Sequence, residues 1–146
     1  MTGVWVLLGT LVLGAVAGLV LRARNGRISA ARTHDLPEVV AAALDPAASV
    51  TLVQISTTFC APCRHTRVIL SNLAEKTPGL RHVDLDVTEQ PEVAHALSVL
   101  RTPTTLALAS DGHELLRVGG VPKAADLLEA LKPYLDLSNS GMHPKE

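Results

Sequence analysis

The 146 residues suffice for one domain of ordinary size with short additions, and a hydrophobic content of 47% is typical of a folded chain. The net charge is −1, and Trp5, Phe59 and Tyr134 are the only aromatic residues, so the chain lacks both the basic surface and the stacking rings that nucleic-acid binding requires. We therefore expect no nucleic-acid partner.

Residues 4–21 form an apolar run without a charged side chain. As a helix the run measures about 27 Å at about 1.5 Å per residue, close to the roughly 30 Å hydrocarbon core of a bilayer. It predicts a single-pass transmembrane anchor over residues 1–24. The alternative is a cleaved signal peptide, because Ala15-Val16-Ala17 matches a cleavage pattern, although the Met-Thr-Gly start supplies no basic segment.

Basic residues follow the run directly, and the first acidic residue is Asp35. The positive-inside tendency predicts that this flank, and the domain after it, lie on the cytoplasmic side, with the exported side as the alternative. Binding of these cations to anionic head groups is a second interpretation and fits the same side. The cations are Arg22, Arg24, Arg27 and Arg32.

The segment 25–34 is interpreted as a juxtamembrane linker before a domain over residues 35–136, with a short strand at 28–30. We expect a helix at 36–44 with Asp35 as its N-cap, because Pro37 suits a first turn. A β-branched strand follows at 50–56, then a helix at 64–76 and a strand at 80–87. From Pro91 a helix is expected whose apolar positions are Val93, Ala96, Leu97 and Leu100.

Strands at 104–109 and 114–118 flank Asp111-Gly112, which favours a tight hairpin. A final helix carries Leu127, Leu128 and Leu131, and Pro133 is expected to end or kink it. Residues 137–146 are expected to form a flexible tail. Alternating helices and strands followed by a hairpin predict an α/β fold with a mixed central sheet flanked by helices.

Cys60 and Cys63 are the only cysteines, and they lie between the strand at 50–56 and the helix after it. Their loop is too short to restrain an unfolded chain, so the pair is either redox-active or half of a metal site. A structural zinc site needs four ligands, whereas a second pair is missing and the histidines are scattered. Attached haem would need His where Arg64 stands. We expect no metal and no cofactor.

At the start of a helix, unpaired backbone N–H groups and the helix dipole stabilise an anion. Cys60 is therefore expected to be the exposed thiolate that attacks a disulfide, and Cys63, one turn further, the less exposed thiol that resolves the mixed disulfide. Pro62 stiffens the loop between them.

Residues 48–134 resemble the thioredoxin family through the strand, the Cys60-Ala61-Pro62-Cys63 motif and the helix, and through Thr102-Pro103 ahead of the next strand. The resemblance implies a thioredoxin-like fold, a cis Pro103 opposite the cysteines and Gly119 close to the site. It also implies a thiol–disulfide oxidoreductase whose clients are protein disulfides or dithiols and whose electron donor is a dithiol or flavoprotein reductase.

The site departs from the family pattern at several supporting positions. Phe59 replaces a Trp, Ala61 a Gly and Thr102 an Ile. Gln54 stands where the family has a buried Asp that helps to deprotonate the second cysteine, and His82 stands where that Asp has a Lys partner. Because Gln54 cannot titrate, the sequence predicts slow resolution by Cys63.

Two classes of function stay open. The first is an enzyme, a membrane-tethered protein-disulfide oxidoreductase that uses Cys60 and Cys63, with an exported oxidase or cytochrome-assembly reductase as its variant. The second is a redox-inactive or weakly active binding or chaperone module at the membrane, motivated by Gln54, Phe59 and Thr102. His65 and Arg67 are expected on the surface near the cysteines, and Asp84 and Asp86 are not expected to form a catalytic pair.

Overall fold

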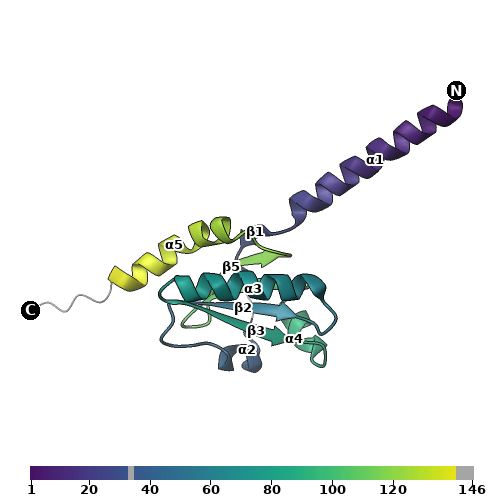
Figure 1. Ribbon diagram of the computed structural model, residues 1–146. Helices are drawn as coiled ribbons and strands as arrows, with labels where there is room; N and C mark the ends of the chain where they lie inside the picture. Colours follow the sequence, from purple (N-terminus) through teal and green to yellow (C-terminus); the bar gives the residue numbers. More distant parts are fainter. Residues whose placement is uncertain (33–34, 141–146) are drawn as a thin grey trace, which may run out of the picture.

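Within the residues that the structure describes, 1–32 and 35–140, five strands form one mixed sheet (Figure 1). The structure is a computed structural model. The strands are β1 (Arg27–Ala30), β2 (Val50–Ser56), β3 (Leu80–Asp86), β4 (Thr104–Ala109) and β5 (Glu114–Gly119). The helices are α1 (Thr2–Arg24), α2 (Glu38–Ala42), α3 (Ala61–Lys76), α4 (Pro91–Ala96) and α5 (Ala124–Ser140).

β2 is an interior strand of the sheet, whose order is β1-β5-β4-β2-β3, and every residue of β2 is buried. A strand covered on both faces needs apolar, β-branched side chains along its whole length, as the sequence supplies here. β2 runs parallel to β3 and antiparallel to β4, so that Ser56 pairs with Asp86 and Ile55 with Thr104. This end of the sheet therefore faces the loop that carries the cysteines.

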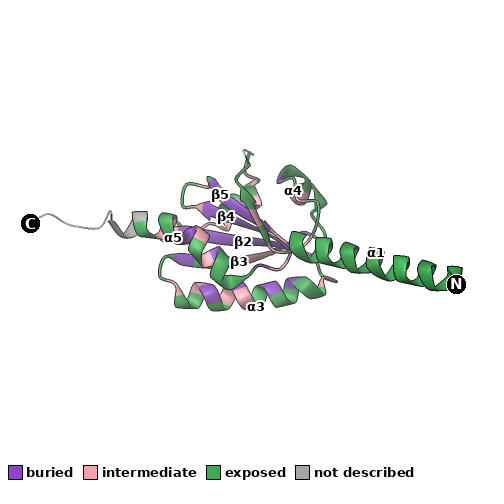
Figure 2. Cartoon of the chain, turned by 90° about the horizontal axis from the view of Figure 1, so that it is seen from above, coloured by how far each residue is buried: buried purple, intermediate pink, exposed green. Residues whose placement is uncertain are grey.

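Helices cover both faces of the sheet (Figures 1 and 2). α3 and α5 pack on one face through Leu70, Leu73, Leu127 and Leu131. α2 and α4 pack on the other face, where Val40 and Val93 join a second cluster. The predicted α/β architecture with a mixed sheet is confirmed.

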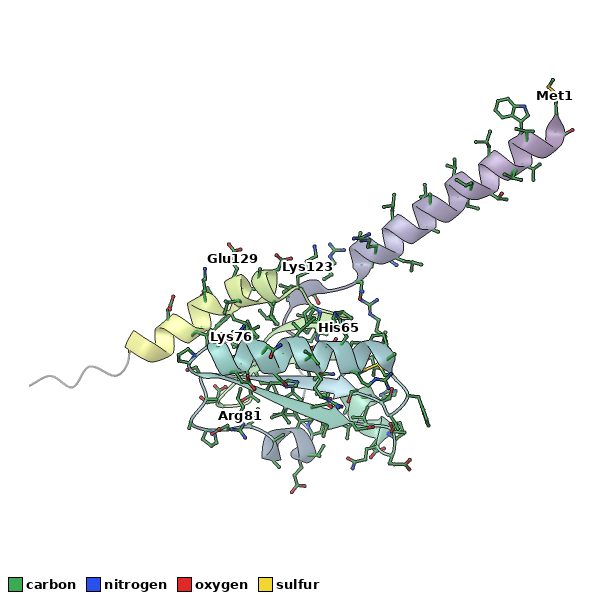
Figure 3. All side chains as sticks on the ribbon, in the orientation of Figure 1. Met1, His65, Lys76, Arg81, Lys123 and Glu129 are labelled. Atoms are coloured by element: carbon green, nitrogen blue, oxygen red, sulfur yellow. A yellow bond between two sulfur atoms is a disulfide. The ribbon has the colours of Figure 1, made fainter. Side chains whose placement is uncertain are left out.

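α1 has no buried residue, and its apolar side chains project on all sides (Figure 3). An 18-residue window within its 23 residues has a mean hydropathy of 2.5, which suits a membrane span, and its place near the N-terminus also suits a signal sequence. A helix that is apolar all round needs an apolar environment on every side. α1 leaves the sheet at the end to which β2 and β3 point (Figures 1 and 2).

β1 belongs to the sheet, although the sequence placed residues 25–34 in a linker and began the domain at residue 35. Arg27 to Ala30 pair antiparallel with β5, with Ile28 opposite Val118. A four-residue edge strand with one half-buried apolar side chain gives too weak a pattern to mark a domain boundary. The short strand itself was predicted at 28–30 and is confirmed.

Two helices are shorter than predicted. Asp35 does not cap α2, because the N-cap is Pro37, whose carbonyl accepts from the backbone of Val40. α4 ends at Ala96, since Ser98 takes a positive φ of 52°, and the predicted apolar position Leu100 is 95% exposed. The backbone turn at Ser98 therefore ends α4 before Leu100, although the apolar spacing of the sequence predicted a longer helix.

The last helix is longer than predicted. α5 continues through Pro133 to Ser140, so residues 137–140 of the expected tail are helical, and residues 141–146 lie outside the described part of the chain. Pro133 is exposed, whereas Leu127 and Leu131 are fully buried against the sheet. Packing of that apolar stripe stabilises the helix enough to tolerate the lost backbone hydrogen bond.

Candidate functional site

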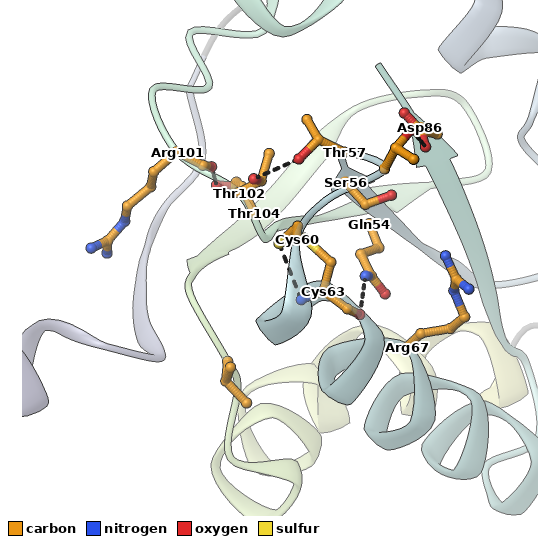
Figure 4. The surroundings of a disulfide bond; sticks show 12 residues. Gln54, Ser56, Thr57, Cys60, Cys63, Arg67, Asp86, Arg101, Thr102 and Thr104 are labelled. Carbon is orange, nitrogen blue, oxygen red and sulfur yellow. Dashed lines mark hydrogen bonds between the residues drawn. A yellow bond between two sulfur atoms is a disulfide. The ribbon is translucent and has the colours of Figure 1, made fainter. Parts of the chain in front are cut away.

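The cysteine pair lies where β2 gives way to α3 and forms a disulfide (Figure 4). Cys60 is the N-cap of α3, and its Sγ accepts from the backbone N–H of Cys63 at 3.2 Å. Cys60 is partly exposed, whereas Cys63 is only 2% exposed. The two sulfurs therefore differ in access to a partner molecule, and the accessible one lies at the helix terminus, where backbone N–H groups favour an anion.

The side chains next to Cys60 present an apolar surface to solvent. Phe59 is 96% exposed, and Ala61 and Pro62 are also exposed. Exposed apolar groups beside a reactive sulfur are suited to contact a protein substrate.

The loop before β4 approaches the cysteine loop. The Thr102–Pro103 peptide bond is cis, as the resemblance implied. The Thr102 hydroxyl lies 3.4 Å from that of Thr57, which follows β2 (Figure 4). Pro103 is buried, and its carbonyl accepts from the backbone of Gly120 at 2.8 Å. Thr57 therefore links the two loops. The sequence did not identify Thr57 as a site residue, because only its position directly after the strand pointed to such a role.

Gly119 lies at the end of β5, and Arg101 crosses it. A Cβ at Gly119 would come within 2.8 Å of Nη2 of Arg101, which donates to the Gly119 carbonyl at 3.3 Å and to the Arg24 carbonyl at 3.2 Å. Sequence reasoning placed Gly119 near the site and missed Arg101, which directly precedes Thr102. A side chain at Gly119 would require the Arg101 guanidinium to shift from this position.

Gln54 forms a hydrogen bond to the backbone of Cys63. Its side chain is fully buried, and Nε2 donates to the Cys63 carbonyl at 2.8 Å (Figure 4). Its Oε1 is 3.1 Å from Nε2 of His82, whose Nδ1 is 3.1 Å from the hydroxyl of Ser71. Because Gln54 Oε1 only accepts, His82 carries its proton on Nε2 and accepts from Ser71 on Nδ1. The structure thus links Gln54, His82 and Cys63, and adds Ser71.

Arg67 does not act as an isolated cation beside Cys60. Its guanidinium forms an ion pair with Asp84, which also accepts from the Ser56 hydroxyl at 2.7 Å. Asp86 is exposed, and hydrogen bonds from the Thr88 side chain and backbone lower the pKa of Asp86. Asp84 and Asp86 therefore have different hydrogen-bond partners.

The remaining histidines of helices α3 and α4 lie on the surface. His65 and His95 are exposed, and Figure 3 shows His65 on α3. Within residues 1–32 and 35–140, no group of three or more His, Cys, Asp or Glu side chains gathers as metal ligands.

His82 gives the site a pH dependence. Burial lowers the pKa of His82 below its usual 6.5, the Asp84 carboxylate opposes that shift, and the Arg67 guanidinium adds to it. The unfolded chain therefore binds a proton at a higher pH than the folded chain, and stability falls as the pH drops below about 6.5. We expect the decline to stay under about 1.4 kcal/mol per pH unit, the limit for one proton.

Amide hydrogen exchange of β2 in the detergent-solubilised chain between pH 7.5 and 5.5 checks this prediction. The decline should shrink in His82→Gln, which keeps a donor for Gln54, and should persist in His65→Asn. An equal decline in all three proteins would contradict the assignment.

Comparison with known proteins agrees with this geometry. The Thioredoxin family model matches residues 34–133. A thioredoxin H-type from Oryza sativa subsp. indica is 29% identical over 103 residues, which cover 70% of this chain and 84% of the relative. A thioredoxin from Mycobacterium bovis is 36% identical over 81 residues, which cover 55% and 69%.

Solved structures share the fold. A single-residue mutant of a thioredoxin from Halobacterium salinarum superposes with a TM-score of 0.59 at 24% identity, and the match covers 68% of this chain and 86% of that thioredoxin. The thioredoxin NaTrxh from Nicotiana alata gives a TM-score of 0.52 at 28% identity, covering 58% and 72%. Thioredoxins act on protein disulfides and receive electrons from reductases. With its Cys60–Cys63 pair, the chain belongs to the thioredoxin family and is a thiol–disulfide oxidoreductase.

Proposed function

We propose that the chain is a membrane-tethered reductase of protein disulfides, with Cys60 as nucleophile and Cys63 as resolving cysteine. The observation that carries the proposal is the difference in exposure between the two sulfurs, because Cys60 is accessible at the N-cap of α3 and Cys63 is 2% exposed. A client disulfide can therefore approach Cys60 and not Cys63.

Two exchange steps complete the reaction. The Cys60 thiolate attacks one sulfur of the client disulfide, so that a mixed disulfide forms and the other client sulfur leaves as a thiolate. Cys63 then loses its proton and attacks Cys60, which releases the second client sulfur and leaves the Cys60–Cys63 disulfide. Two electrons pass to the client, and a dithiol or flavoprotein reductase restores the pair.

Gln54 changes the second step. Its amide donates to the Cys63 carbonyl and positions the residue, but an amide does not accept the Cys63 proton. The client thiolate released in the first step, or solvent, takes this proton instead. We infer that resolution is the slow step and depends on the basicity of the client thiolate.

The other predicted site residues form the client-binding surface in this proposal. Phe59, Ala61 and Pro62 offer exposed apolar contact beside Cys60. Thr102 and Pro103 supply the opposing loop, which Thr57 and Gly120 hold in place. Gly119 leaves room at the edge of that surface.

The side of the membrane on which the reaction takes place is inferred from α1 and the arginines at its end. α1 is apolar on every side, and Arg22 and Arg24 occupy its last turn. We propose that residues 4–21 span a membrane once and that the arginines keep the redox domain on the cytoplasmic side, where thiols are held reduced.

Alkylation of the two cysteines in growing cells tests side and direction together, because the chain has no other thiol. A cytoplasmic reductase should be found mainly as the dithiol. A permeant maleimide should label it in intact cells, and an impermeant maleimide only after lysis. Cys60→Ser keeps a single thiol and therefore shows the mass of a chain that carries one maleimide. A pair that is oxidised in acid-quenched cells, or open to the impermeant reagent, would contradict the proposal and favour an exported oxidase.

A further inference from the structure

A pocket of about 370 Å³ opens where α1 meets the sheet. Its lining comes from three separate parts of the chain: the end of α1 with β1, the loop before β4, and the end of β5. Thr104 and Gly119 belong to its wall, so the pocket adjoins the loop of the cis proline. The pocket shares Gly119 with the edge of the proposed client-binding surface, and its other lining residues have no role in the proposed disulfide exchange.

The lining is strongly basic in a chain of net charge −1. Arg24, Arg27, Arg32 and Arg101 all line it, together with Arg117, which is paired with Glu114. Among the residues that the structure describes, no carboxylate side chain is part of the lining. Several guanidinium groups around one cavity favour a phosphate, which Arg binds with fork-like donor geometry.

The pocket is fixed to the end of α1. Arg101 donates to the carbonyl of Arg24, the last residue of α1, and the backbone N–H of Gly26 donates to the Gly119 carbonyl at 2.9 Å. The Asn25 side chain accepts from the backbone of Val121 at 3.1 Å. The arginines therefore keep a set position relative to the proposed membrane span.

With residues 4–21 as the proposed membrane span, the pocket arginines lie in the head-group layer of the bilayer. Arg24 follows Leu21, the end of the apolar run, by three residues, or about 4.5 Å of helix. The head-group region extends about 5–8 Å beyond the hydrocarbon core on each side. Leu100, 95% exposed, and Val99 form an apolar part of the same wall. Cations beside an exposed apolar side chain match the phosphate and the acyl chains of a lipid.

We propose that this pocket binds the phosphate of one anionic phospholipid, an inference that rests on the proposed membrane span. The bound head group holds the domain against the bilayer, with the disulfide end of the sheet near the membrane surface. The proposal explains why arginines from the end of α1, from the segment of β1 and from the loop before β4 all line one cavity.

Native mass spectrometry of the full chain, released from nanodiscs of equal phosphatidylglycerol and phosphatidylcholine, tests the proposal. Wild type should retain one phosphatidylglycerol in preference to phosphatidylcholine. Arg27→Gln and Arg32→Gln should each lower that preference about fivefold, consistent with the contribution of one cation near an anionic surface. Both residues make their bonds to β5 through backbone groups, which glutamine keeps. Arg81→Gln, on β3, should retain the wild-type preference.

The outcomes distinguish failure of the lipid-binding inference from failure of the proposed membrane span. A chain that does not copurify with nanodiscs overturns the membrane span and this inference together. A chain that inserts but shows no preference for phosphatidylglycerol, or keeps it in both pocket variants, overturns the inference alone. Saturation of the detergent-solubilised chain by glycerol 3-phosphate, with the same arginine dependence, would assign the pocket to a soluble phosphate and also overturn it.

Discussion

Replacing Cys63 with serine is expected to leave Cys60 covalently attached to its client proteins. Cys60 is accessible and still attacks a client disulfide, but no thiol is placed to release the product. Disulfide reduction, measured with insulin and dithiothreitol on the detergent-solubilised chain, should fall to the uncatalysed background. Non-reducing electrophoresis and mass spectrometry of the membrane fraction should reveal mixed disulfides through Cys60.

Cys60→Ser is the matched control, because it also leaves a single thiol. That thiol is Cys63, which is 2% exposed, so the control should lose activity and trap no clients. Equal trapping by both variants would contradict the assignment of nucleophile and resolving cysteine. Insulin reduction by Cys60→Ser at the wild-type rate would contradict the proposed chemistry altogether.

Arg117→Ala is expected to destabilise the domain more than any change at an exposed charge. Arg117 and Glu114 form a bidentate pair at 2.7 and 2.8 Å with 6% of each side chain exposed, and Arg117 also donates to the Leu97 carbonyl. Removing the guanidinium breaks the bidentate ion pair of a buried carboxylate, which costs about 3–5 kcal/mol. Amide hydrogen exchange of β4 and β5 measures the loss.

Two further variants separate burial of charge from loss of contacts. Arg81→Ala removes an ion pair with Asp45 that is 58% and 32% exposed, and should cost at most about 1 kcal/mol. The double replacement Glu114→Gln with Arg117→Met removes both charges and should recover much of the stability. A similar small loss for Arg117→Ala and Arg81→Ala would contradict the role given to burial.

The elements with strong local signals were predictable from the sequence. A continuous β-branched run indicated β2, the stripes of α3 and α5 indicated their packing faces, and Asp111-Gly112 indicated the hairpin. The cysteine motif located the redox site at a helix start, and the resemblance to the thioredoxin family added Pro103 with its cis bond. The strands, helices, hairpin and cysteine motif depend on neighbouring residues, so one sequence suffices to find them.

Features that depend on contacts distant in the sequence could not be predicted in the same way. β1 was predicted as a short strand, but its pairing with β5, which brings it into the domain, was not, and α4 stops early because Ser98 turns the backbone. Gln54 was identified as a missing acid, but its bond to the Cys63 carbonyl and the link through His82 to Ser71 required coordinates. The approach of Arg101 to the arginines after α1 likewise required coordinates, because these residues are distant in the sequence.

Equilibration of the full chain in redox buffers tests the central claim most directly. After alkylation of free thiols, mass spectrometry reports the fractions of dithiol and of Cys60–Cys63 disulfide. A thiol–disulfide oxidoreductase should convert reversibly in one two-electron step, with a midpoint between about −120 and −300 mV, the range that such enzymes span. A pair that stays oxidised below that range, or does not convert reversibly, would be structural and would contradict the account.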